Sequence, residues 1–506
     1  MKTETGCCYL VGAGPGDPGL LTLRGKECIE EADVVVYDYL SNPEFLRWAK
    51  PEAELIYAGK KSKDHTLTQD QINALLIEKA KEGKTVTRLK GGDPMVFGRG
   101  GEEAGELGQA GVPYELIPGI SSTIAGPAYA GIPVTHRACN SQLTIFTGHE
   151  DPTKENCSVD YAKMANTDGV KVMLMGVERL GVITSAMLAG GADPEQPVAL
   201  VRWATTNRQE TLCGTVNDIA AKAKKAEFKA PAVAVFGEVV NCRESLQWFE
   251  TRPLFGKRIV VTRTRKQAGV LSKKLRQLGA DVFELPTIRI EPPKDLRGFA
   301  ELVRDAHQYD WLIFTSPNGV ESFFETFYKL YSDAREIGGV RIAAMGPGTA
   351  QKIKEYHLTV DLLPERFVAE GLIEAFKKDS SVDNLKMLWV KAEKTREVIS
   401  EELTKMGGIV DEAIAYRTVP ETDDIGGGIK RFREEGADII TFTSSSTAEC
   451  FRALDLPIPD GLQVASIGPI TSQTVRDEGM EVAIEAKKHD IPGLVQAILK
   501  LAGKKA

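Results

Sequence analysis

Short apolar runs alternate with longer amphipathic stretches along the first half of the chain. The runs Asp33–Tyr37, Thr85–Leu89 and Lys171–Met175 have the length and the β-branched content of strands that are buried in a sheet. The segments between such runs are long enough, and mixed enough in polarity, to form helices. This alternation predicts an α/β protein.

A change of pattern near residue 250 divides the chain. The segment Trp248–Gly256 contains a proline and a glycine, and Lys257–Arg263 follows it as a short apolar run typical of an opening strand. A chain of 506 residues is also longer than the roughly 250–300 residues that one hydrophobic core supports. We therefore expect two parts, residues 1–250 and residues 251–506.

The second part contains an internal repeat. Ile313–Asn318 (IFTSPN) recurs as Thr441–Ser446 (TFTSSS), and Ala344–Thr349 (AMGPGT) recurs as Ser466–Thr471 (SIGPIT) at a similar offset. Two units are too few for a solenoid, so the repeat predicts two similar, doubly wound lobes that face each other. The space between two lobes is a common place for a small-molecule site.

The composition excludes several classes of protein. A net charge of −8 argues against a general nucleic-acid-binding protein, because binding to phosphates requires a basic surface. No apolar stretch reaches the ~18 residues of a membrane span, and the N-terminus lacks the layout of a signal peptide. We therefore expect a cytoplasmic protein whose partners include neither nucleic acid nor a membrane.

The cysteines and histidines show no metal-binding motif. The eight cysteines form no CxxC pair, and the six histidines form no HExxH pair. Cysteines spread thinly over such a length are typical of reduced cytosolic thiols. The sequence therefore predicts no metal site.

A glycine-rich turn, Val11–Gly19 (VGAGPGDPG), opens the first part. Such a turn after a strand suggests that backbone approaches a ligand closely. It is not a dinucleotide-binding fingerprint, because Asp17 stands where that pattern requires glycine and two prolines interrupt the turn. A purely structural loop is the alternative.

Further motifs follow this turn along the first part. The stretches are VGAGPGD (11–17), LTLRG (21–25), ADVVVYD (32–38), GK (59–60), RLKGGDP (88–94), FGRGGEE (97–103), PGISS (118–122), AYAGIPVTHR (128–137) and WF (248–249). With these motifs in this order, the first part resembles the tetrapyrrole methylase family, specifically the uroporphyrinogen-III C-methyltransferases.

The resemblance implies a two-subdomain fold, a homodimer formed through this part, and S-adenosylmethionine (SAM) as methyl donor. It implies that Asp38 accepts a proton and that Lys60 donates one, although Asp38 could cap a turn and Lys60 could belong to a solvated surface run. Met175 could equally be a core residue. The implied SAM-binding residues are Pro15, Gly91, Gly92, Asp93, Val96, Ser121, Ser122, Met175 and Gly214. Because the substrate carries eight carboxylates, basic residues are its expected partners: Arg88, Lys90, Arg99 and Arg137.

Residues 251–506 carry sparser marks and resemble uroporphyrinogen-III synthase. The marks are VTR (261–263), TS (315–316), GPGT (346–349), Tyr416, TSS (443–445), GP (468–469) and Thr471. The resemblance implies two lobes joined by two strand-like linkers, here Leu285–Ile290 and Ala413–Arg417. Tyr416 would assist loss of the hydroxyl from a linear tetrapyrrole, while hydroxyls and backbone amides bind its carboxylates. The expected substrate-binding residues are Thr315, Ser316, Thr349, Ser444 and Thr471, each of which could instead cap a helix.

Together the two resemblances imply a bifunctional enzyme that cyclises hydroxymethylbilane to uroporphyrinogen III and then methylates the product twice. Other functions stay open. The first part could methylate another tetrapyrrole or an RNA, and the second part could bind a tetrapyrrole without turning it over. A periplasmic-type binding module would fit two lobes, but it usually needs a signal peptide.

Overall fold

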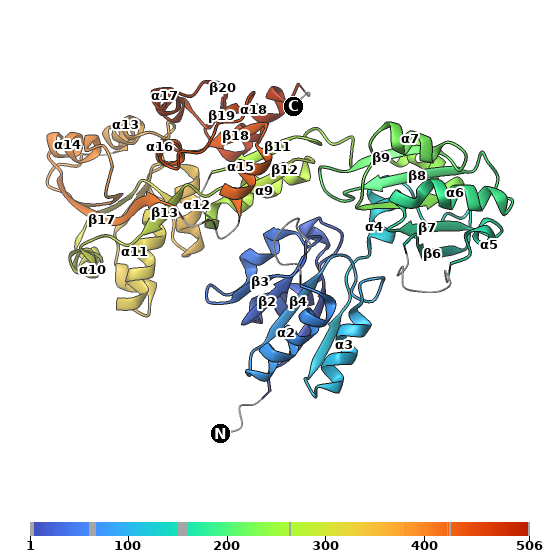
Figure 1. Cartoon of the computed structure of the whole chain (residues 1–506). Helices are drawn as coiled ribbons and strands as arrows, with labels where there is room; N and C mark the ends of the chain where they lie inside the picture. The colour runs from blue at the N-terminus through green and yellow to red at the C-terminus, as the bar shows by residue number, and fades with distance from the viewer. Residues whose placement is uncertain are drawn as a thin grey trace.

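The computed structural model describes residues 5–59, 67–149, 159–262, 265–379, 381–422, 424 and 427–503. In this part of the chain the strands form four five-stranded sheets with helices packed around them, which confirms the predicted α/β class. Figure 1 shows the four sheets as separate bodies, two in the first half (blue and green) and two in the second half (yellow-green to red).

The first sheet is parallel throughout, in the order β3-β2-β4-β1-β5. Its central strand β4 is buried along its whole length, as expected for a parallel strand covered on both faces. The strands are β1 (Cys8–Gly12), β2 (Val34–Tyr37), β3 (Glu54–Tyr57), β4 (Val86–Lys90) and β5 (Tyr114–Ile117), and the helices are η1 (Pro18–Leu20), α1 (Leu23–Glu31), η2 (Pro43–Trp48), α2 (Gln69–Lys81) and α3 (Gly100–Gln109).

The second sheet, in the order β6-β7-β10-β8-β9, is mostly antiparallel, and only β6 and β7 run parallel. The short connection between β8 and β9 allows only antiparallel pairing of these two strands. The elements are α4 (Ser122–Tyr129), β6 (Leu143–Thr147), α5 (Tyr161–Ala165), β7 (Val170–Leu174), η3 (Val177–Arg179), α6 (Leu180–Ala189), β8 (Pro197–Arg202), β9 (Glu210–Thr215), α7 (Ile219–Lys225), β10 (Ala232–Phe236), η4 (Glu238–Cys242) and α8 (Arg243–Leu246).

The second half forms two lobes. The outer lobe contains the parallel sheet β12-β11-β18-β19-β20. Its strands therefore come from both ends of the second half. Its elements are β11 (Arg258–Val261), α9 (Arg265–Gln277), β12 (Asp281–Glu284), α15 (Gly428–Glu435), β18 (Ile439–Phe442), α16 (Ser445–Ala453), β19 (Gln463–Ser466), α17 (Pro469–Asp477), β20 (Val482–Glu485) and α18 (Ile491–Leu501).

The inserted lobe lies between these two segments in the chain and contains the sheet β13-β17-β16-β14-β15. Its elements are β13 (Ile288–Glu291), α10 (Leu296–Arg304), η5 (Ala306–Gln308), β14 (Trp311–Phe314), α11 (Pro317–Leu330), η6 (Ala334–Ile337), β15 (Arg341–Ala344), α12 (Pro347–Glu355), α13 (Ala369–Asp379), β16 (Lys386–Ala392), α14 (Val398–Lys405) and β17 (Ile409–Pro420).

Two adjacent strands lead across between the lobes. The predicted linker Leu285–Ile290 spans the first crossing, whereas the predicted linker Ala413–Arg417 is misplaced: Ala413, Ile414 and Tyr416 pair with β16 inside the inserted lobe, and the return crossing follows Pro420. The strand β13 follows the first crossing from the outer lobe, β17 precedes the return crossing, and the two pair antiparallel from Ile288↔Pro420 to Glu291↔Arg417. Thr287, at the first crossing, donates its hydroxyl to the carbonyl oxygens of Thr262 and Thr447, both in the outer lobe. Each lobe thus combines strands from both copies of the sequence repeat, which the repeat alone does not reveal.

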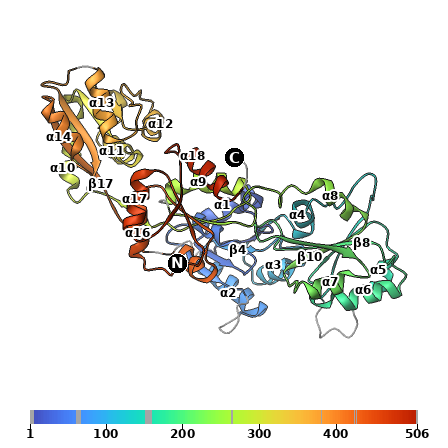
Figure 2. The ribbon, with the colours of Figure 1, turned by 90° about the horizontal axis from the view of Figure 1, so that it is seen from above.

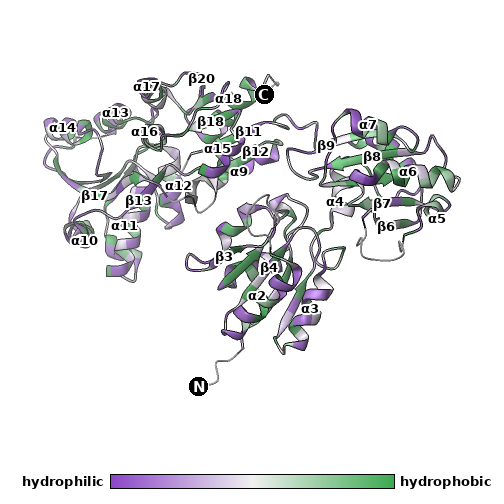
Figure 3. Cartoon of the chain, viewed as in Figure 1, coloured by the Kyte–Doolittle hydropathy of each residue, from purple (hydrophilic) through white to green (hydrophobic). Residues whose placement is uncertain are grey.

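Each sheet has its own apolar core, visible in Figure 3 as hydrophobic strands beneath helices with hydrophilic outer faces. In the inserted lobe, α11 buries Phe323, Phe324 and Phe327 on one face against Phe314 of β14. Among the described helices, none combines the length and the apolar character of a membrane span.

Between Phe249 and Leu254 the chain leaves the apolar core of the first half and enters that of the outer lobe. Phe249 packs against Tyr129 at the end of α4, and the Glu250 carboxylate accepts hydrogen bonds from Gln209 and Thr211. Leu254, four residues later, belongs to the core of the outer lobe.

A group of charged side chains joins the first half to the outer lobe. Arg276 of α9 donates a hydrogen bond to Glu44 of η2, and Arg47 donates to Glu284 at 3.4 Å. The second carboxylate oxygen of Glu44 is buried without a hydrogen-bond partner, and burial raises the pKa of this carboxyl group. Figures 1 and 2 both show α9 beside the first subdomain.

We predict that Arg276→Ala destabilises the protein by about 1–3 kcal/mol, because the largely buried Glu44 carboxylate loses its hydrogen-bonded partner and keeps only the charges of Arg47 and Arg431 nearby. The midpoint of urea unfolding measures this change. Arg297→Ala is the matched control, since Arg297 pairs with Glu301 on the solvent face of α10 and its side chain is 92% exposed. Equal midpoints for the two variants would contradict an interface stabilised by this ion pair.

Candidate functional site

Most of the residues expected to bind SAM lie at one edge of the first sheet. Because β1, β2, β4 and β5 are parallel, their carboxyl ends meet at the same edge, where α/β proteins commonly bind ligands. Asp38 directly follows β2, Gly91 and Gly92 follow β4, and Pro15 lies in the turn after β1. Ser121 and Ser122 stand at the start of α4, a few residues after β5. The structure therefore brings these predicted residues together.

The loops at this edge are held together by direct backbone contacts. The Gly14 amide donates to the Gly92 carbonyl oxygen at 3.1 Å, and the Gly92 amide donates to the Gly14 carbonyl oxygen at 2.7 Å. Both residues have positive φ angles, near +70°. A Cβ atom on Gly119 would lie 2.2 Å from the Gly92 carbonyl oxygen and 2.6 Å from the Gly12 Cα atom. Gly14 and Gly92 are favoured by their backbone conformation, whereas Gly119 is required because the loops approach one another there at backbone distance.

Asp93 joins two of these loops. Its carboxylate accepts hydrogen bonds from the Met95 amide at 2.7 Å and from the Gly119 amide at 2.9 Å. Ser121 caps α4 by accepting from the Thr123 amide at 3.3 Å. Val96, in the same loop as Asp93, is half-buried. Asp93 and Ser121 were expected to bind SAM, but in the structure the Asp93 carboxylate and the Ser121 hydroxyl hydrogen-bond to the backbone and so fix the shape of the loops.

The second subdomain meets this edge through the turn after β8. The Thr205 hydroxyl accepts from the Asp17 amide at 3.1 Å, and the Asp17 carboxylate accepts from the Tyr129 hydroxyl at 2.8 Å. The ring of Trp203 lies 6.0 Å from that of Tyr39. The sequence analysis missed the segment 203–206, which carries neither a glycine nor a known motif; the signal it offered is a pair of threonines directly after a buried strand.

Backbone strain marks the same region. Trp203, Thr205 and Met175 all adopt positive φ angles, of +46°, +68° and +56°. Residues with side chains seldom adopt this conformation outside functional sites. Met175 directly follows β7 and is 50% exposed, so it is not the core residue that its strand-like context would suggest.

Gly214 is not brought to this site. It pairs with Val198 in β8, in the same row as Phe236 of β10 and Lys171 of β7. Met175 lies beyond the opposite end of β7, roughly 13 Å farther along the strand direction. A Cβ atom on Gly214 would meet the Asp218 carboxylate at 2.4 Å, so packing against the turn before α7 explains this glycine.

Asp38 lies beside a buried cluster of charges. Arg88 reaches the Asp38 carboxylate at 3.5 Å and the Glu103 carboxylate at 3.4 Å. Lys90 lies 2.6 Å from the same Glu103 oxygen, and the Glu103 side chain is fully buried. Burial lowers the pKa of Lys90. The sequence analysis did not single out Glu103, since an acidic residue in the first turn of α3 is typical of an ordinary helix start.

This cluster changes the picture of the expected carboxylate partners. Arg88 and Lys90 are buried and form ion pairs with carboxylates of the protein. They therefore lie behind the sheet edge and not on its surface. Arg99 is exposed and pairs with Glu102, and Arg137 is exposed. Lys60 lies outside the described residues.

Several large apolar side chains are exposed on the loops of this edge, in the first turn of α4 and directly after β7. Each is between 39% and 57% accessible. Exposed apolar side chains of this size, where they adjoin, are typical of a surface that binds a large ligand or another protein chain. These side chains are Tyr39, Leu40, Met95, Phe97, Ile120, Ile124 and Met175.

In the second half, Tyr416 contacts one of the predicted hydroxyl residues. Its phenolic oxygen lies 2.9 Å from the Ser316 hydroxyl, and Ser316 also accepts from the Gly319 amide at 3.0 Å. Tyr416 is buried in β17, and burial raises the pKa of its phenol. At neutral pH this phenol is therefore protonated and able to donate a hydrogen bond.

The remaining predicted residues mark the starts of four helices, two in each lobe. Ser316 and Ser444 are the N-cap residues of α11 and α16. Thr349 and Thr471 are buried in the first turns of α12 and α17, and Thr315 is half-buried at the end of β14. All four helices begin at the carboxyl ends of parallel strands, and helix N-termini favour carboxylate groups.

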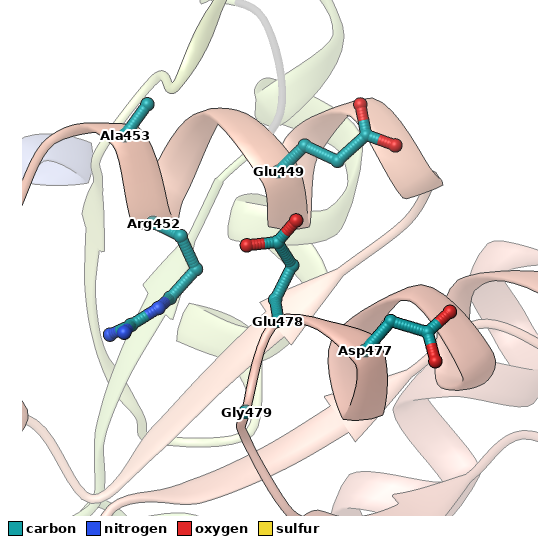
Figure 4. A pocket seen from close by; sticks show the side chains of 6 residues that line it. All are labelled: Glu449, Arg452, Ala453, Asp477, Glu478 and Gly479. Atoms are coloured by element: carbon teal, nitrogen blue, oxygen red, sulfur yellow. The ribbon is translucent and has the colours of Figure 1, made fainter.

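A surface pocket between α16 and α17 is a different feature (Figure 4). It contains three carboxylates, from Glu449, Asp477 and Glu478, and a single guanidinium, from Arg452. An acidic pocket disfavours a polycarboxylate ligand, and none of the predicted substrate residues lines it.

Comparison with known proteins matches two family models to separate stretches of the chain. The model of the Tetrapyrrole (Corrin/Porphyrin) Methylases matches residues 8–220, and that of Uroporphyrinogen-III synthase HemD matches residues 269–496. The Porphyrin biosynthesis protein HemD of Ruminiclostridium josui is 36% identical over 99% of both chains.

Two relatives match the first half alone. The Uroporphyrinogen-III C-methyltransferase of Methanocaldococcus jannaschii is 52% identical over 48% of this chain and 99% of its own. The S-adenosyl-L-methionine-dependent uroporphyrinogen III methyltransferase of Methanosarcina barkeri is 48% identical over 49% of this chain and 96% of its own.

We predict that Gly119→Ala lowers stability by about 3 kcal/mol or more, because the added methyl group forces the three loops apart. Gly105→Ala is the control: it lies in α3 with nothing within 4 Å of an added Cβ atom, and we expect it to stabilise the protein by about 0.5–1 kcal/mol. Thermal unfolding of both variants measures the difference. A neutral Gly119→Ala would contradict the close backbone contact.

We predict that Glu103→Ala destabilises the protein by about 3–5 kcal/mol, because Lys90 and Arg88 then lose their buried counter-charge. Its neighbour Glu102 provides the control, since it pairs with Arg99 at the surface, and Glu102→Ala should change stability by no more than about 0.5 kcal/mol. Urea unfolding of the two variants distinguishes them, and similar midpoints would show that Glu103 does not hold the cluster together.

Proposed function

Because this chain belongs to both the tetrapyrrole methylase and the uroporphyrinogen-III synthase families, we propose that it carries out two reactions of tetrapyrrole biosynthesis, one in each half. Residues 251–506 cyclise hydroxymethylbilane to uroporphyrinogen III with inversion of the last ring, and residues 1–250 methylate the product twice to give precorrin-2. The full-length match to a porphyrin biosynthesis protein carries this conclusion, because it spans both halves in one chain.

The first half uses SAM, whose sulfonium supplies an electrophilic methyl group. The loops at the carboxyl edge of the first sheet fit such a ligand, because Gly92 leaves open space where a side chain would stand, while exposed Met175 offers a soft apolar contact. We assign the SAM site to Pro15, Gly91, Gly92, Val96, Ser121, Ser122, Met175 and the added segment 203–206, with Asp93 holding the loops in place. Gly214 is left out because of its position in the sheet.

Methylation also requires a proton to leave the substrate. Asp38 is the proposed acceptor, since its carboxylate follows β2 directly at the sheet edge. Ser41 donates a hydrogen bond to one Asp38 oxygen at 3.1 Å, and Arg88 lies 3.5 Å from the other. These contacts orient the carboxylate, and the Glu103 charge behind Arg88 fixes the arginine in turn. Lys60 remains the proposed proton donor.

The second half has a lighter chemical task. Pyrrole nitrogen stabilises the cation formed when hydroxide leaves, so the protein mainly orients a flexible chain and assists departure of the hydroxyl. Tyr416 is the proposed donor to that hydroxyl, because its phenol stays protonated and is oriented by Ser316. The helix starts marked by Thr315, Ser316, Thr349, Ser444 and Thr471 are the proposed partners of the substrate carboxylates.

Several further properties belong to this proposal. We expect the protein to act in the cytoplasm, without nucleic acid or a membrane as partner. We also expect a homodimer through the first half, since its apolar edge residues are only half covered in the single chain. Exposed Arg99 and Arg137 are the proposed contacts to carboxylates of the methylation substrate, with Arg88 and Lys90 supporting the site from behind.

The test is an assay of the purified chain with hydroxymethylbilane and SAM, in which products are separated by mass and by isomer. We expect a dimethylated product of the III isomer. Uroporphyrinogen III without added methyl groups would contradict the proposal for the first half, and only the spontaneously formed I isomer would contradict that for the second.

Two variants assign the reactions to their halves. Asp38→Asn should abolish methylation and leave cyclisation unchanged, while Tyr416→Phe should slow cyclisation about 10²-fold or more and leave methylation of supplied uroporphyrinogen III unchanged. Tyr309→Phe is the control for the second variant, because Tyr309 donates to Asp411 in the same lobe, away from Ser316. Equal rates for Tyr416→Phe and Tyr309→Phe would remove Tyr416 from the reaction.

A further inference from the structure

Three soft metal ligands meet at the surface of the second subdomain. His136 and Cys139 lie in the loop between α4 and β6, and Cys242 is the last residue of η4. One ligand atom from each lies within 4.8 Å of the others, and the Cys139 sulfur is 3.6 Å from Nδ1 of His136. The sequence analysis predicted no metal site, because Cys242 lies far along the chain from the other two residues.

The observed separation matches the geometry of a zinc site. With Zn–S bonds of about 2.3 Å, Zn–N bonds of about 2.0–2.1 Å and tetrahedral angles, neighbouring ligand atoms are roughly 3.5–3.8 Å apart. The Cys139–His136 distance already falls in this range. Small changes in side-chain torsion angles would bring all three ligand atoms to bonding distance of one ion.

The loop that carries two of the ligands is already ordered by its own hydrogen bonds. The amides of Cys139 and Asn140 both donate to the His136 carbonyl oxygen at 2.9 Å, and the Asn140 side chain donates to the carbonyl oxygens of Val134 and Gln142. The Ala138 amide donates to Nδ1 of His136 at 3.3 Å, so this nitrogen is the unprotonated one and the imidazole proton lies on Nε2. Because Nδ1 has a single lone pair, an ion bound there would replace this long hydrogen bond.

The third ligand is held just as firmly. Cys242 is followed by Arg243, whose guanidinium donates to the Ala130 carbonyl oxygen and to the Glu250 carboxylate. Ser245 donates to the Cys242 carbonyl oxygen at 3.2 Å. These bonds fix η4 against the end of α4, the helix that leads into the ligand loop.

We propose that His136, Cys139 and Cys242 bind one Zn²⁺ ion, with water in the fourth position. Two thiols lose their protons to become thiolates, which neutralise the charge of the ion. The ion clamps the loop 134–142 to η4 and so fixes the backbone of Arg137, next to His136. The site is separate from the loops at the edge of the first sheet, and the proposal does not depend on either reaction.

The first experiment measures zinc binding by the reduced, metal-free full-length protein in competition with a chromophoric chelator. We expect one ion to bind per chain, and Cys139→Ser and Cys242→Ser each to weaken binding at least 10-fold. Cys450→Ser is the control, since Cys450 lies in α16 of the outer lobe, and it should bind as the unaltered protein does. Circular dichroism establishes that each variant is folded.

The second experiment identifies the ligands directly. The metal-free protein is treated with a thiol-alkylating reagent in the presence and absence of Zn²⁺, and the modified cysteines are mapped by mass spectrometry. Zinc should protect Cys139 and Cys242 but leave Cys450 unaffected. The proposal is overturned if the two thiols react equally fast in both conditions, or if the Cys139→Ser/Cys242→Ser double variant binds zinc as tightly as the unaltered protein.

Discussion

The contact between Gly12, Gly92 and Gly119 is the constraint on which the first half depends. Three strands end within backbone distance of one another, so Gly12 and Gly119 cannot carry side chains, and the positive φ of Gly92 favours glycine there too. The amides of Gly92 and Gly119 hold the loops together by donating to the Gly14 carbonyl oxygen and the Asp93 carboxylate. The turn after β1 also reaches Thr205, which ties the second subdomain to the first. The shape of the site therefore follows from direct backbone contact between the loops.

The buried charges beside that edge serve orientation more than stability. Pairing Lys90 and Arg88 with Glu103 compensates charges that would be unfavourable if buried alone, and it leaves one Glu103 oxygen without a hydrogen bond. An apolar cluster would fill the same space with less desolvation. A charged cluster, however, gives the Asp38 carboxylate a guanidinium in a defined position. The second half orients Tyr416 more simply, through one hydroxyl that also caps a helix.

The sequence predicted the α/β class and the two lobes of the second half, because apolar runs and an internal repeat can be read from the chain itself. Through its resemblance to the tetrapyrrole methylase family, the sequence also indicated the residues that follow β1, β2, β4 and β5. It did not reveal Glu103, the turn at Thr205 or the proposed metal ligand Cys242, since each acts through partners distant in the chain. Gly214 is an example of the opposite kind: the family resemblance suggested it for the SAM site, but its close contact with Asp218 is enough to explain a glycine there. Local patterns locate loops, whereas register and packing decide which side chains meet.

The exchange of strands between the two lobes governs the order in which they can form during synthesis. The strands β11 and β12 leave the ribosome first, but β11 can pair with its second neighbour, β18, only after that strand has been synthesised. About 155 residues separate the end of β12 at Glu284 from the start of β18 at Ile439. At roughly 5–20 residues per second, this delay is about 8–30 s. The inserted lobe can fold within that interval, while the apolar edge of β11 waits unpaired, as an open strand prone to pairing with other chains. Nascent chains of this architecture should therefore depend on chaperones most strongly between completion of the inserted lobe and arrival of β18.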